Sequence, residues 1–318
     1  MAGNVAALAG LIGRCPAMER LKRDLMLFGP SDVRVHVFGE TGTGKEIVAK
    51  AVHALSPRAG RPLVAVNVAG LSDELLISEL FGHARGAFTG AVTDHEGYVA
   101  RAEGSTLFVD EVGDMSCLTQ VRLLRFLEDG EYQRLGDTAV RKADVRVVSA
   151  TSVDLERRVR EGRFRADLWF RLKGERLDLP PLRERGDDVL LLARHFLHRH
   201  SADRGGSPPP LSREAEAALL GHSWPGNVRE LQHEMRHAGV RATGRPVGIE
   251  DLSPELQERP SRRAGPLREA VRRFEAELIL DALARHHGNV ARAATDLGMT
   301  RQALWARTRR PPLVAEGA

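Results

Sequence analysis

A glycine-rich stretch, GETGTGKE at residues 39–46, contains the residue types that bind phosphate. Glycines let successive backbone N–H groups turn toward a phosphate, and the helix that follows adds partial positive charge. Lys45 would reach the terminal phosphates, as in a P-loop, whereas a simple glycine turn is the alternative. Glu46 stands where Ser or Thr ordinarily ligates magnesium, so it can act only through the metal or its waters. The predicted nucleotide-binding residues are Gly39, Glu40, Thr41, Gly42, Thr43, Gly44, Lys45 and Glu46.

A second stretch, TLFVDEV, places two carboxylates at the end of an apolar strand. Asp110 can hold Mg²⁺ there, usually through water, and Glu111 can orient and deprotonate an attacking water. The alternative is an edge strand that ends in an acidic turn, which the P-loop upstream disfavours. The two stretches together predict hydrolysis of a nucleoside triphosphate rather than binding alone.

The pattern of the chain predicts the elements that position these groups. Short β-branched runs alternate with helical patterns from residue 33 to about residue 148, which predicts a parallel sheet flanked by helices, with functional groups at the carboxyl ends of the strands. Beyond Pro181, apolar residues recur at helical spacing, as in a helical lid. We therefore predict an α/β subdomain over residues 1–180, a lid over 181–252, a linker rich in Pro, Gly and charge over 253–266, and a separate domain over 267–318.

Charge and cysteine content limit the partners and the compartment. Residues 259–318 hold 12 Arg, no Lys and 6 Asp or Glu. This distribution is typical of a nucleic-acid contact, although a solvated arginine-rich helix would look the same. Cys15 and Cys117 lack metal-ligand spacing, and no stretch approaches the roughly 20 apolar residues of a membrane helix. We expect a cytoplasmic protein with no membrane partner.

A loop motif lies between the two nucleotide motifs, within FGHARGAFTGAV at residues 81–92. Glycines and alanines bury little surface and leave the backbone loose, so we expect a mobile loop with an exposed Phe at its tip. The six residues of the motif are Gly86, Ala87, Phe88, Thr89, Gly90 and Ala91.

These motifs resemble those of the AAA+ activators that act on the sigma-N (sigma-54) form of bacterial RNA polymerase, the NtrC-like enhancer-binding proteins. The resemblance extends from about residue 11 to residue 310, and GAFTGA is close to diagnostic of the family. It implies an α/β AAA+ P-loop fold with a helical lid, and ATP and Mg²⁺ as nucleotide and cofactor. It also implies that Phe88 and Thr89 contact the sigma factor, whereas an ordinary surface loop is the alternative.

Further positions match family motifs. Asn67 resembles the asparagine that pairs with the catalytic glutamate, here Glu111, and Arg165 and Arg171 resemble arginine fingers supplied to a neighbouring subunit. Arg229, in WPGNVRELQ, resembles the sensor arginine that reads the γ-phosphate. An Asn at a strand end can instead be a turn residue, and each finger candidate can be a surface salt-bridge partner. Fingers supplied in trans require an assembly, a hexameric ring in this family.

Three local features complete the resemblance. EYQRLGD, at residues 131–137, resembles a second, shorter loop of the ring pore. Ser152 stands where the family usually has Asn in its first sensor, so its hydrogen bond to the hydrolytic water could be altered. Ala84 replaces a customary acidic residue just before GAFTGA, which could change how that loop is tethered.

The chain after residue 267 has the pattern of a helix-turn-helix domain. A helix over about residues 289–297 is followed by a turn at Gly298 and Met299, and Thr300 caps a third helix. The segment resembles the Fis-type DNA-binding domain, although Trp305 could equally lie in a core. The predicted DNA contacts are Arg301, Gln302 and Trp305 toward base edges, and Arg307, Arg309 and Arg310 toward phosphates.

The sequence therefore predicts an ATP-hydrolysing activator that binds enhancer-like upstream DNA and remodels the closed promoter complex of the sigma-54 RNA polymerase holoenzyme. Because the ATPase begins almost at Met1, we expect no receiver domain, and control by a separate regulatory protein or by concentration. One alternative is a DNA-binding regulator or repressor with an AAA+ fold that does not remodel polymerase. It should lack an intact GAFTGA. Another is an AAA+ remodeller of other proteins or DNA, which needs neither the loop nor the tail.

Overall fold

The computed structural model describes residues 7–202, 207–242, 244–257 and, near the C-terminus, 278–279, 282–283, 285–286, 289–300, 302 and 304. The chain divides into two compact units, Met1–Gln257 and Glu258–Ala318. None of the helices in these described ranges has the length and apolar character needed to cross a bilayer. The elements are α2 (Pro16–Phe28), β1 (Val35–Phe38), α3 (Lys45–Ala54), β2 (Val64–Asn67), α4 (Asp73–Phe81), α5 (Tyr98–Arg101), β3 (Thr106–Asp110), η1 (Val112–Asp114), α6 (Cys117–Asp129), β4 (Glu131–Tyr132), β5 (Arg141–Lys142), β6 (Arg146–Thr151), α7 (Leu155–Arg160), α8 (Ala166–Leu172), β7 (Glu175–Asp178), η2 (Leu182–Glu184), α9 (Asp188–Ala202), α10 (Arg213–Gly221), α11 (Asn227–Arg241), η3 (Ile249–Asp251), α12 (Pro254–Gln257) and α14 (Val290–Asp296).

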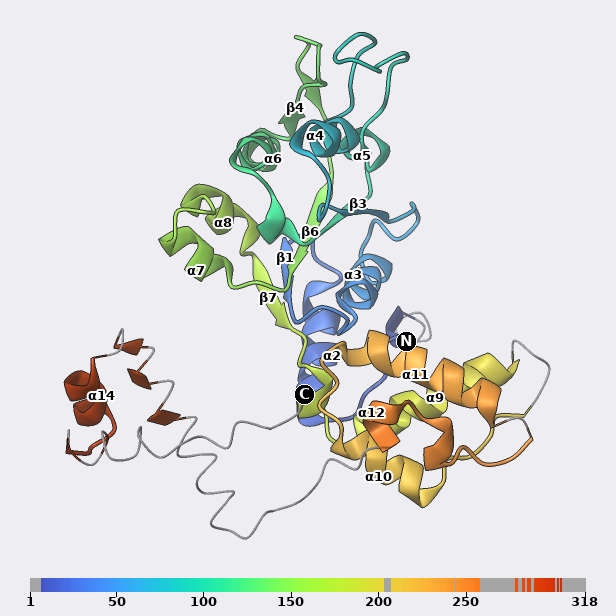
Figure 1. The fold of residues 1–318 in the computed structure, drawn as a ribbon. Coiled ribbons are helices and arrows are strands. Elements are labelled where there is room, and N and C mark those ends of the chain that lie inside the picture. The colour runs from blue at the N-terminus through green and yellow to red at the C-terminus, as the bar shows by residue number, and fades with distance from the viewer. Residues whose placement is uncertain are drawn as a thin grey trace. The chain divides into compact units, whose positions relative to one another are not determined.

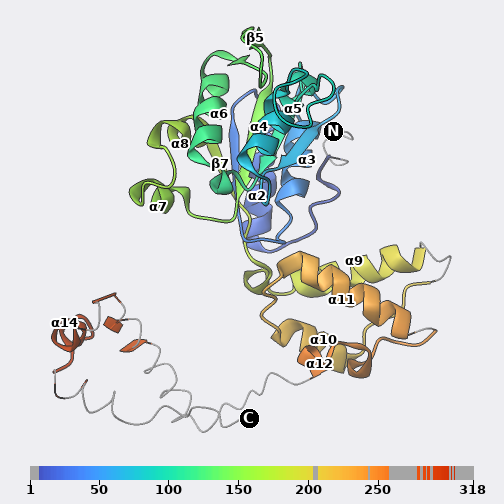
Figure 2. The ribbon, with the colours of Figure 1, turned by 45° about the horizontal axis from the view of Figure 1, so that its top comes forward.

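The centre of the first unit is a five-stranded parallel sheet of order β2-β3-β6-β1-β7 (Figures 1 and 2). Every residue of central β6 is buried, whereas the edge strand β2 alternates between buried and exposed positions. This difference arises because helices cover both faces of the central strands of a parallel sheet. The predicted parallel sheet flanked by helices is confirmed.

Two apolar clusters pack on the two faces of the sheet. One joins α2 and α3 to β1, with Val35 and Phe108 among its buried members. The other joins α4, α6 and α8 to the opposite face, with Leu107 and Val147 among its buried members. Side chains alternate across a strand, which is why the neighbours Leu107 and Phe108 belong to different clusters.

The edge strand β7 was not predicted from the sequence. Its four residues, ERLD, contain only Leu177 as a buried position, so the strand lacks the β-branched run that marks the others. It pairs with β1 in parallel, with Leu177 beside Val37. Tertiary pairing, rather than local propensity, makes this segment a strand.

The predicted helical lid is confirmed as a separate layer of helices, α9, α10, α11 and α12 (Figure 2). Its core closes around the buried side chain of Trp224, whose ring N–H donates to the Leu219 carbonyl at 2.9 Å. The short α12 contributes Leu256 to the same core. The segment 253–266, which the sequence assigns to a linker, therefore begins with residues that pack on the lid.

The second unit contains the predicted helix-turn-helix pattern. The side chain of Asn289 caps α14 and accepts hydrogen bonds from the Ala291 and Arg292 N–H groups at 3.1 and 3.3 Å. Gly298, at φ +65°, ends the helix in the left-handed region. Among the predicted DNA contacts, Gln302 is helical and exposed, whereas the others lie outside the described residues: Arg301, Trp305, Arg307, Arg309 and Arg310.

Candidate functional site

The predicted phosphate-binding turn connects the carboxyl end of β1 to the first turn of α3. Gly42 and Gly44 have φ values of +81° and +107°, which L side chains rarely adopt. A Cβ atom on Gly42 would also lie 2.3 Å from the Gly226 carbonyl oxygen, in the lid. Gly42 is therefore required both by the backbone conformation and by the close approach of the lid.

The ammonium of Lys45 and the carboxylate of Glu111 meet at the end of the sheet. Lys45 is only 6% exposed, and its Nζ donates to the Gly39 carbonyl and to Glu111 Oε1, each at 3.0 Å. Glu111 Oε2 accepts hydrogen bonds from the Ser152 N–H at 3.0 Å and from Ser152 Oγ at 2.9 Å. Three separate segments, after β1, β3 and β6, thus hold one carboxylate in place.

The environments of the two neighbouring carboxylates differ. Burial raises the pKa of Glu111, but Lys45 and the two donors of Ser152 outweigh it, so the pKa lies below its ordinary value. Burial instead raises the pKa of Asp110 above its ordinary value, against the opposing effect of Lys45. Glu111 also has φ +56°, an uncommon conformation for a residue with a side chain. The site therefore keeps Glu111 ionised and fixed at neutral pH.

Among the residues near Lys45, Asp110 has the carboxylate that a magnesium ion would need. Mg²⁺ is commonly bound by one or two carboxylates, waters and substrate phosphates. Asp110, partly buried at the end of β3, can supply one such carboxylate, whereas Glu46 is exposed and pairs with Lys50 at 2.7 Å. The described residues contain no group of three or more His, Cys, Asp or Glu arranged to hold a metal by themselves.

Asn67 and Arg229 lie close to these groups but make other contacts. Asn67 pairs with Asp110 in the register of β2 and β3, and its Oδ1 accepts a hydrogen bond from the Ala69 N–H at 2.9 Å. Besides Lys45, the side chain that contacts Glu111 is that of Ser152 rather than Asn67, and the sequence marked Ser152 only as a departure from the family pattern. Arg229 is exposed, and its backbone N–H donates to the Gly42 carbonyl at 3.2 Å.

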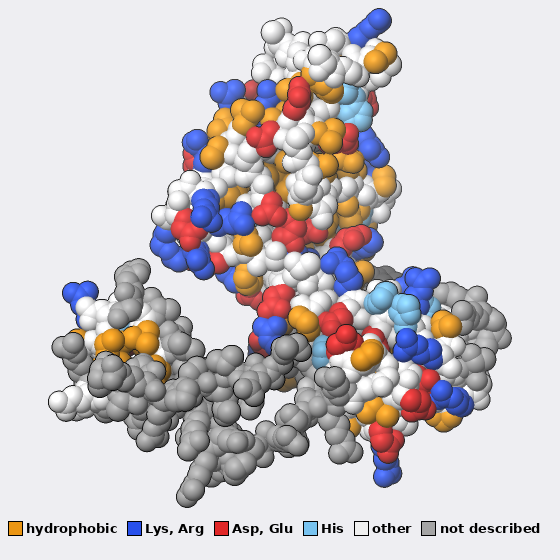
Figure 3. Space-filling view, viewed as in Figure 1, with side chains coloured by type: hydrophobic (Ala, Val, Ile, Leu, Met, Phe, Trp, Pro, Cys, Tyr) orange, Lys and Arg blue, Asp and Glu red, His pale blue; other side chains and the backbone are white. Residues whose placement is uncertain are grey.

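The two candidate arginine fingers lie on the surface around α8. Arg165 pairs with Asp167 at 2.7 Å, and Arg171 approaches Glu128 at 3.8 Å. Their side chains are 46% and 50% exposed. Figure 3 shows basic side chains gathered over α7 and α8. Both arginines thus pair with carboxylates of their own chain and remain accessible to solvent.

The GAFTGA loop follows the end of α4 and folds as a tight turn. The Gly86 N–H donates to the Ala91 carbonyl at 2.8 Å, and Ala91 is buried. The expectation of an exposed Phe at the tip is only partly right: Phe88 is half-buried, and its ring meets the edge of the His83 ring at 5.0 Å between centroids. Thr89 is exposed.

The segment that the sequence assigned to a second loop lies against the first. Residues 131–142 form the β4–β5 hairpin, and the Leu135 carbonyl accepts a hydrogen bond from the Ala84 N–H at 2.9 Å. A Cβ atom on Gly136 would lie 2.7 Å from Ala87 Cβ. The Arg85 N–H donates to the Asp94 carboxylate at 2.8 Å, which gives the loop an acidic tether despite Ala84.

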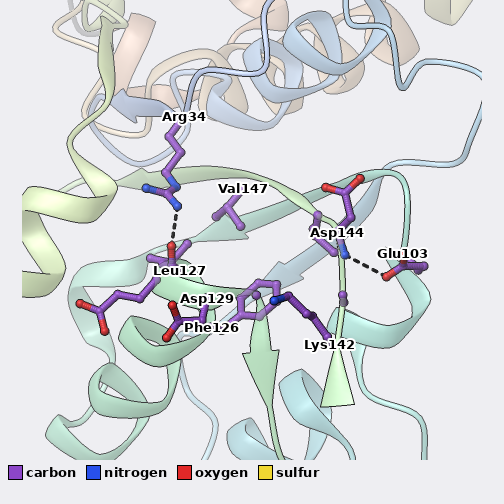
Figure 4. Close-up of a pocket in the computed structure, with 12 residues that line it drawn as sticks. Arg34, Glu103, Phe126, Leu127, Asp129, Lys142, Asp144 and Val147 are labelled. Carbon is purple, nitrogen blue, oxygen red and sulfur yellow. Dashed lines mark hydrogen bonds between the residues drawn. The ribbon is translucent and has the colours of Figure 1, made fainter. Parts of the chain in front are cut away.

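A cavity of about 470 Å³ lies at the opposite, amino ends of the strands, away from the P-loop (Figure 4). Arg34 enters it just before β1, and its guanidinium donates to the Leu127 carbonyl. Acidic and basic side chains from α6 and the β4–β5 hairpin, among them Asp129 and Lys142, line the rest. This cavity is separate from the predicted nucleotide site, whose residues lie at the carboxyl ends of β1, β3 and β6.

A P-loop after the first strand, a strand that ends in two carboxylates and a helical lid define the class of protein: an AAA+ P-loop NTPase. Comparison with known protein families supports this class for three successive segments of the chain. Residues 11–178 match the sigma-54 interaction domain, residues 183–268 the AAA+ ATPase lid domain, and residues 270–310 the Fis family of bacterial regulatory proteins. The chain therefore belongs to the family of sigma-54-dependent transcriptional regulators.

Individual relatives extend the similarity over nearly the whole chain. The transcriptional regulatory protein ZraR of Klebsiella oxytoca is 44% identical over 308 residues, which are 96% of this chain and 70% of ZraR. The anaerobic nitric oxide reductase transcription regulator NorR of Salmonella paratyphi C is 46% identical over 302 residues, 90% of this chain and 60% of NorR. The crystal structure of Brucella abortus NtrX in complex with ATP is 36% identical, with a TM-score of 0.71, over 93% of this chain and 68% of that one.

Proposed function

We propose that the protein is an ATPase that binds upstream DNA, assembles into a ring and remodels the sigma-54 RNA polymerase closed complex through its GAFTGA loop. The observation that carries the proposal is the contact of Glu111 with Lys45 and Ser152 at the carboxyl end of the sheet. An ionised, fixed carboxylate beside a phosphate-binding lysine is what hydrolysis of a nucleotide requires. Crystal structures of the related NtrX contain ATP in one case and ADP in another.

The chain supplies the proton acceptor and the phosphate ligands for this reaction. Glu111 accepts a proton from water as the water oxygen bonds to the γ-phosphorus, and the bond from that phosphorus to the bridging oxygen breaks to release ADP and phosphate. Lys45 and the P-loop N–H groups bind the phosphates. Asp110 would hold Mg²⁺, which neutralises charge on the phosphates when it is bound.

The connection of the strands supports a route from the site to the loop. The loop is inserted between β2 and β3, and the adjacent ends of these strands carry Asn67 and Asp110. The helix α4 leads from β2 to the loop and buries Leu80 and Phe81 in the core. A change in what holds the ends of β2 and β3 would therefore move α4 as a packed body and carry Phe88 and Thr89 with it.

Assembly and DNA binding complete the proposal. Arg165 and Arg171, exposed around α8, would complete the site of a neighbouring subunit and make hydrolysis depend on ring formation. The ring would be hexameric, as in the family that the chain resembles. Several helix-turn-helix units in one ring would bind repeated sites together and so raise the overall affinity for DNA.

The substitution Thr89→Ala tests the remodelling step. We expect ATP hydrolysis and DNA binding to persist while open-complex formation by sigma-54 holoenzyme in vitro is lost. Thr93→Ala is the matched control, because Thr93 is also exposed but lies outside the motif. If the unmodified protein binds DNA and hydrolyses ATP yet forms no open complex, the alternative of a regulator that does not remodel polymerase is favoured.

A further inference from the structure

The side chain of Glu40, in the P-loop, is bound by the lid. The Arg183 guanidinium, in η2, donates from Nη1 to Glu40 Oε2 at 2.8 Å and from Nη2 to Glu40 Oε1 at 2.6 Å. This paired geometry fixes the orientation of both groups as well as their distance. The Glu40 side chain therefore binds the lid, whereas its place in the motif suggested that it contacts the nucleotide.

A buried asparagine of the lid joins the same contact. Asn227, at the start of α11, is fully buried and has φ +54°. Its Nδ2 donates to Glu40 Oε2 and to the Thr41 carbonyl, both at 3.1 Å, while its Oδ1 accepts a hydrogen bond from the Leu182 N–H at 2.8 Å. Both amide protons and the amide oxygen are thus satisfied within this one contact, as a buried amide requires.

Two further hydrogen bonds join the next P-loop residues to the lid. The Gly42 carbonyl accepts a hydrogen bond from the Arg229 N–H at 3.2 Å, and the Thr43 carbonyl accepts one from Arg185 Nη2 at 3.0 Å. Arg229 lies two residues beyond Asn227 in the first turn of the same helix. The position of the Arg229 side chain therefore depends on how this first turn rests on the P-loop.

We propose that Glu40, Arg183 and Asn227 form a lid clasp that positions Arg229 over the nucleotide, so that these three residues set the discrimination between a triphosphate and a diphosphate. The inference rests on the proposed function and on the sensor role that the family resemblance gives to Arg229, which is to read the γ-phosphate. It assigns Glu40 to lid positioning rather than to phosphate binding, and it identifies Arg183 and Asn227 as positioning residues.

The charge state of the clasp is constant near neutral pH. Arg183 and then Asn227 lower the pKa of Glu40 to about 2, so its carboxylate stays ionised. Because the ion pair is partly exposed to solvent, removing Arg183 should have a moderate effect. Replacing Asn227 by Asp should have a larger effect on ATP affinity. The new carboxylate cannot donate, so Glu40 Oε2 and the Thr41 carbonyl would each face another acceptor with no hydrogen bond.

The test compares the equilibrium affinities of the full chain for ATP and ADP, measured by competition with a fluorescent nucleotide. Arg183→Gln should weaken ATP binding about fivefold and ADP binding less than twofold, because the clasp acts through a side chain that meets only the γ-phosphate. Asn227→Asp should weaken ATP binding about tenfold. Adding Glu40→Gln to Asn227→Asp should restore part of the loss, since the new amide can donate to the new carboxylate.

Two controls are needed. One distinguishes loss of the clasp from general destabilisation of the lid, and the other tests the sensor role of Arg229 by itself. Arg194→Gln removes an exposed ion pair of 2.7 Å to Glu216 inside the lid and should change neither affinity. Arg229→Ala should lower the ATP-to-ADP preference by itself. If Arg229→Ala does so while Arg183→Gln and Asn227→Asp leave the preference unchanged, or weaken both nucleotides equally, the clasp is wrong. If Arg229→Ala leaves the preference unchanged, the sensor role of Arg229 is wrong, and the clasp inference fails with it, while ATP hydrolysis by Glu111 is not affected.

Discussion

The nucleotide site and the GAFTGA loop are built in opposite ways. At the nucleotide site, Lys45, Glu111 and Ser152 are joined by several hydrogen bonds, and the lid approaches so closely that Gly42 has no room for a Cβ atom. In the loop, a Cβ atom added to Gly86 or Gly90 would meet no atom within 4 Å beyond its own chain neighbours. The glycines of the first region are enclosed by neighbouring segments, whereas those of the loop are open, and the loop packs only through residues such as Phe88 on His83 and Ala87 near Gly136.

This difference indicates how the two regions can share one chain. A site that orients water must hold its groups within fractions of an ångström, which dense contacts achieve. A surface that meets a partner needs freedom to change position, which sparse contacts allow. Substitutions in the first region should therefore alter nucleotide chemistry, whereas those in the second should leave it intact and alter only transcription.

The largest effect on hydrolysis with ATP binding retained is expected for Glu111→Gln. The amide keeps the shape of the side chain but cannot accept a proton, so the rate of ATP hydrolysis should fall by about 10²–10³-fold. ATP affinity should change little, because the P-loop remains. A phosphate-release assay and an equilibrium binding assay measure the two quantities. Retention of more than a tenth of the rate would assign the proton acceptor to another group.

A matched pair of glycine substitutions tests the comparison directly. Both Gly42→Ala and Gly90→Ala place a side chain at positive φ, which strains the backbone by roughly 1–3 kcal/mol. Gly42→Ala also drives a Cβ atom against the Gly226 carbonyl and should remove measurable ATP binding. Gly90→Ala should leave ATP binding and hydrolysis within twofold of the original while open-complex formation falls. Equal effects on ATP binding would contradict the proposed division.

Ser152→Ala should have a smaller effect with a distinct pH dependence. Loss of the hydroxyl donor removes one contact to the charged form of Glu111, so the pKa of Glu111 rises. The rate should fall about threefold to tenfold, and the acid limb of its pH profile should move to higher pH. Ser152→Thr keeps the hydroxyl and should restore the profile. A lower rate with an unmoved acid limb would argue against the contact.

The smallest effect is expected for His83→Ala. Aromatic pairs contribute about 0.5–1.5 kcal/mol, and because Phe88 is only half-buried its pair with His83 should lie toward the lower end of that range. Freeing the Phe88 ring should therefore reduce open-complex formation only about twofold to fivefold. ATP hydrolysis should stay unchanged, because His83 lies at the loop. His95→Ala is the control, since His95 stacks on His83 but is not in ring contact with Phe88. A change in hydrolysis would mean that the loop base and the site are not independent.

Much of the fold followed from local patterns. The buried strand β3 is a largely apolar run and β6 contains adjacent valines, while the P-loop carries its conformation in its glycines. The parallel sheet and the nucleotide motifs could therefore be predicted from the sequence. The edge strand β7 could not, because ERLD has no strand pattern and pairs only where β1 offers an open edge. The half-buried position of Phe88 likewise depends on His83, a contact that spacing does not reveal.

Within the site, the sequence determined which chemical groups are present: the glycine turn, Lys45, and the carboxylates that end β3. Their types and order depend only on the local chain. Only the tertiary structure decided their partners, namely Ser152 for Glu111 and the lid residues Arg183 and Asn227 for Glu40. The physical reason is that these pairs are 41, 143 and 187 residues apart in the chain, and packing of the sheet and the lid brings them together.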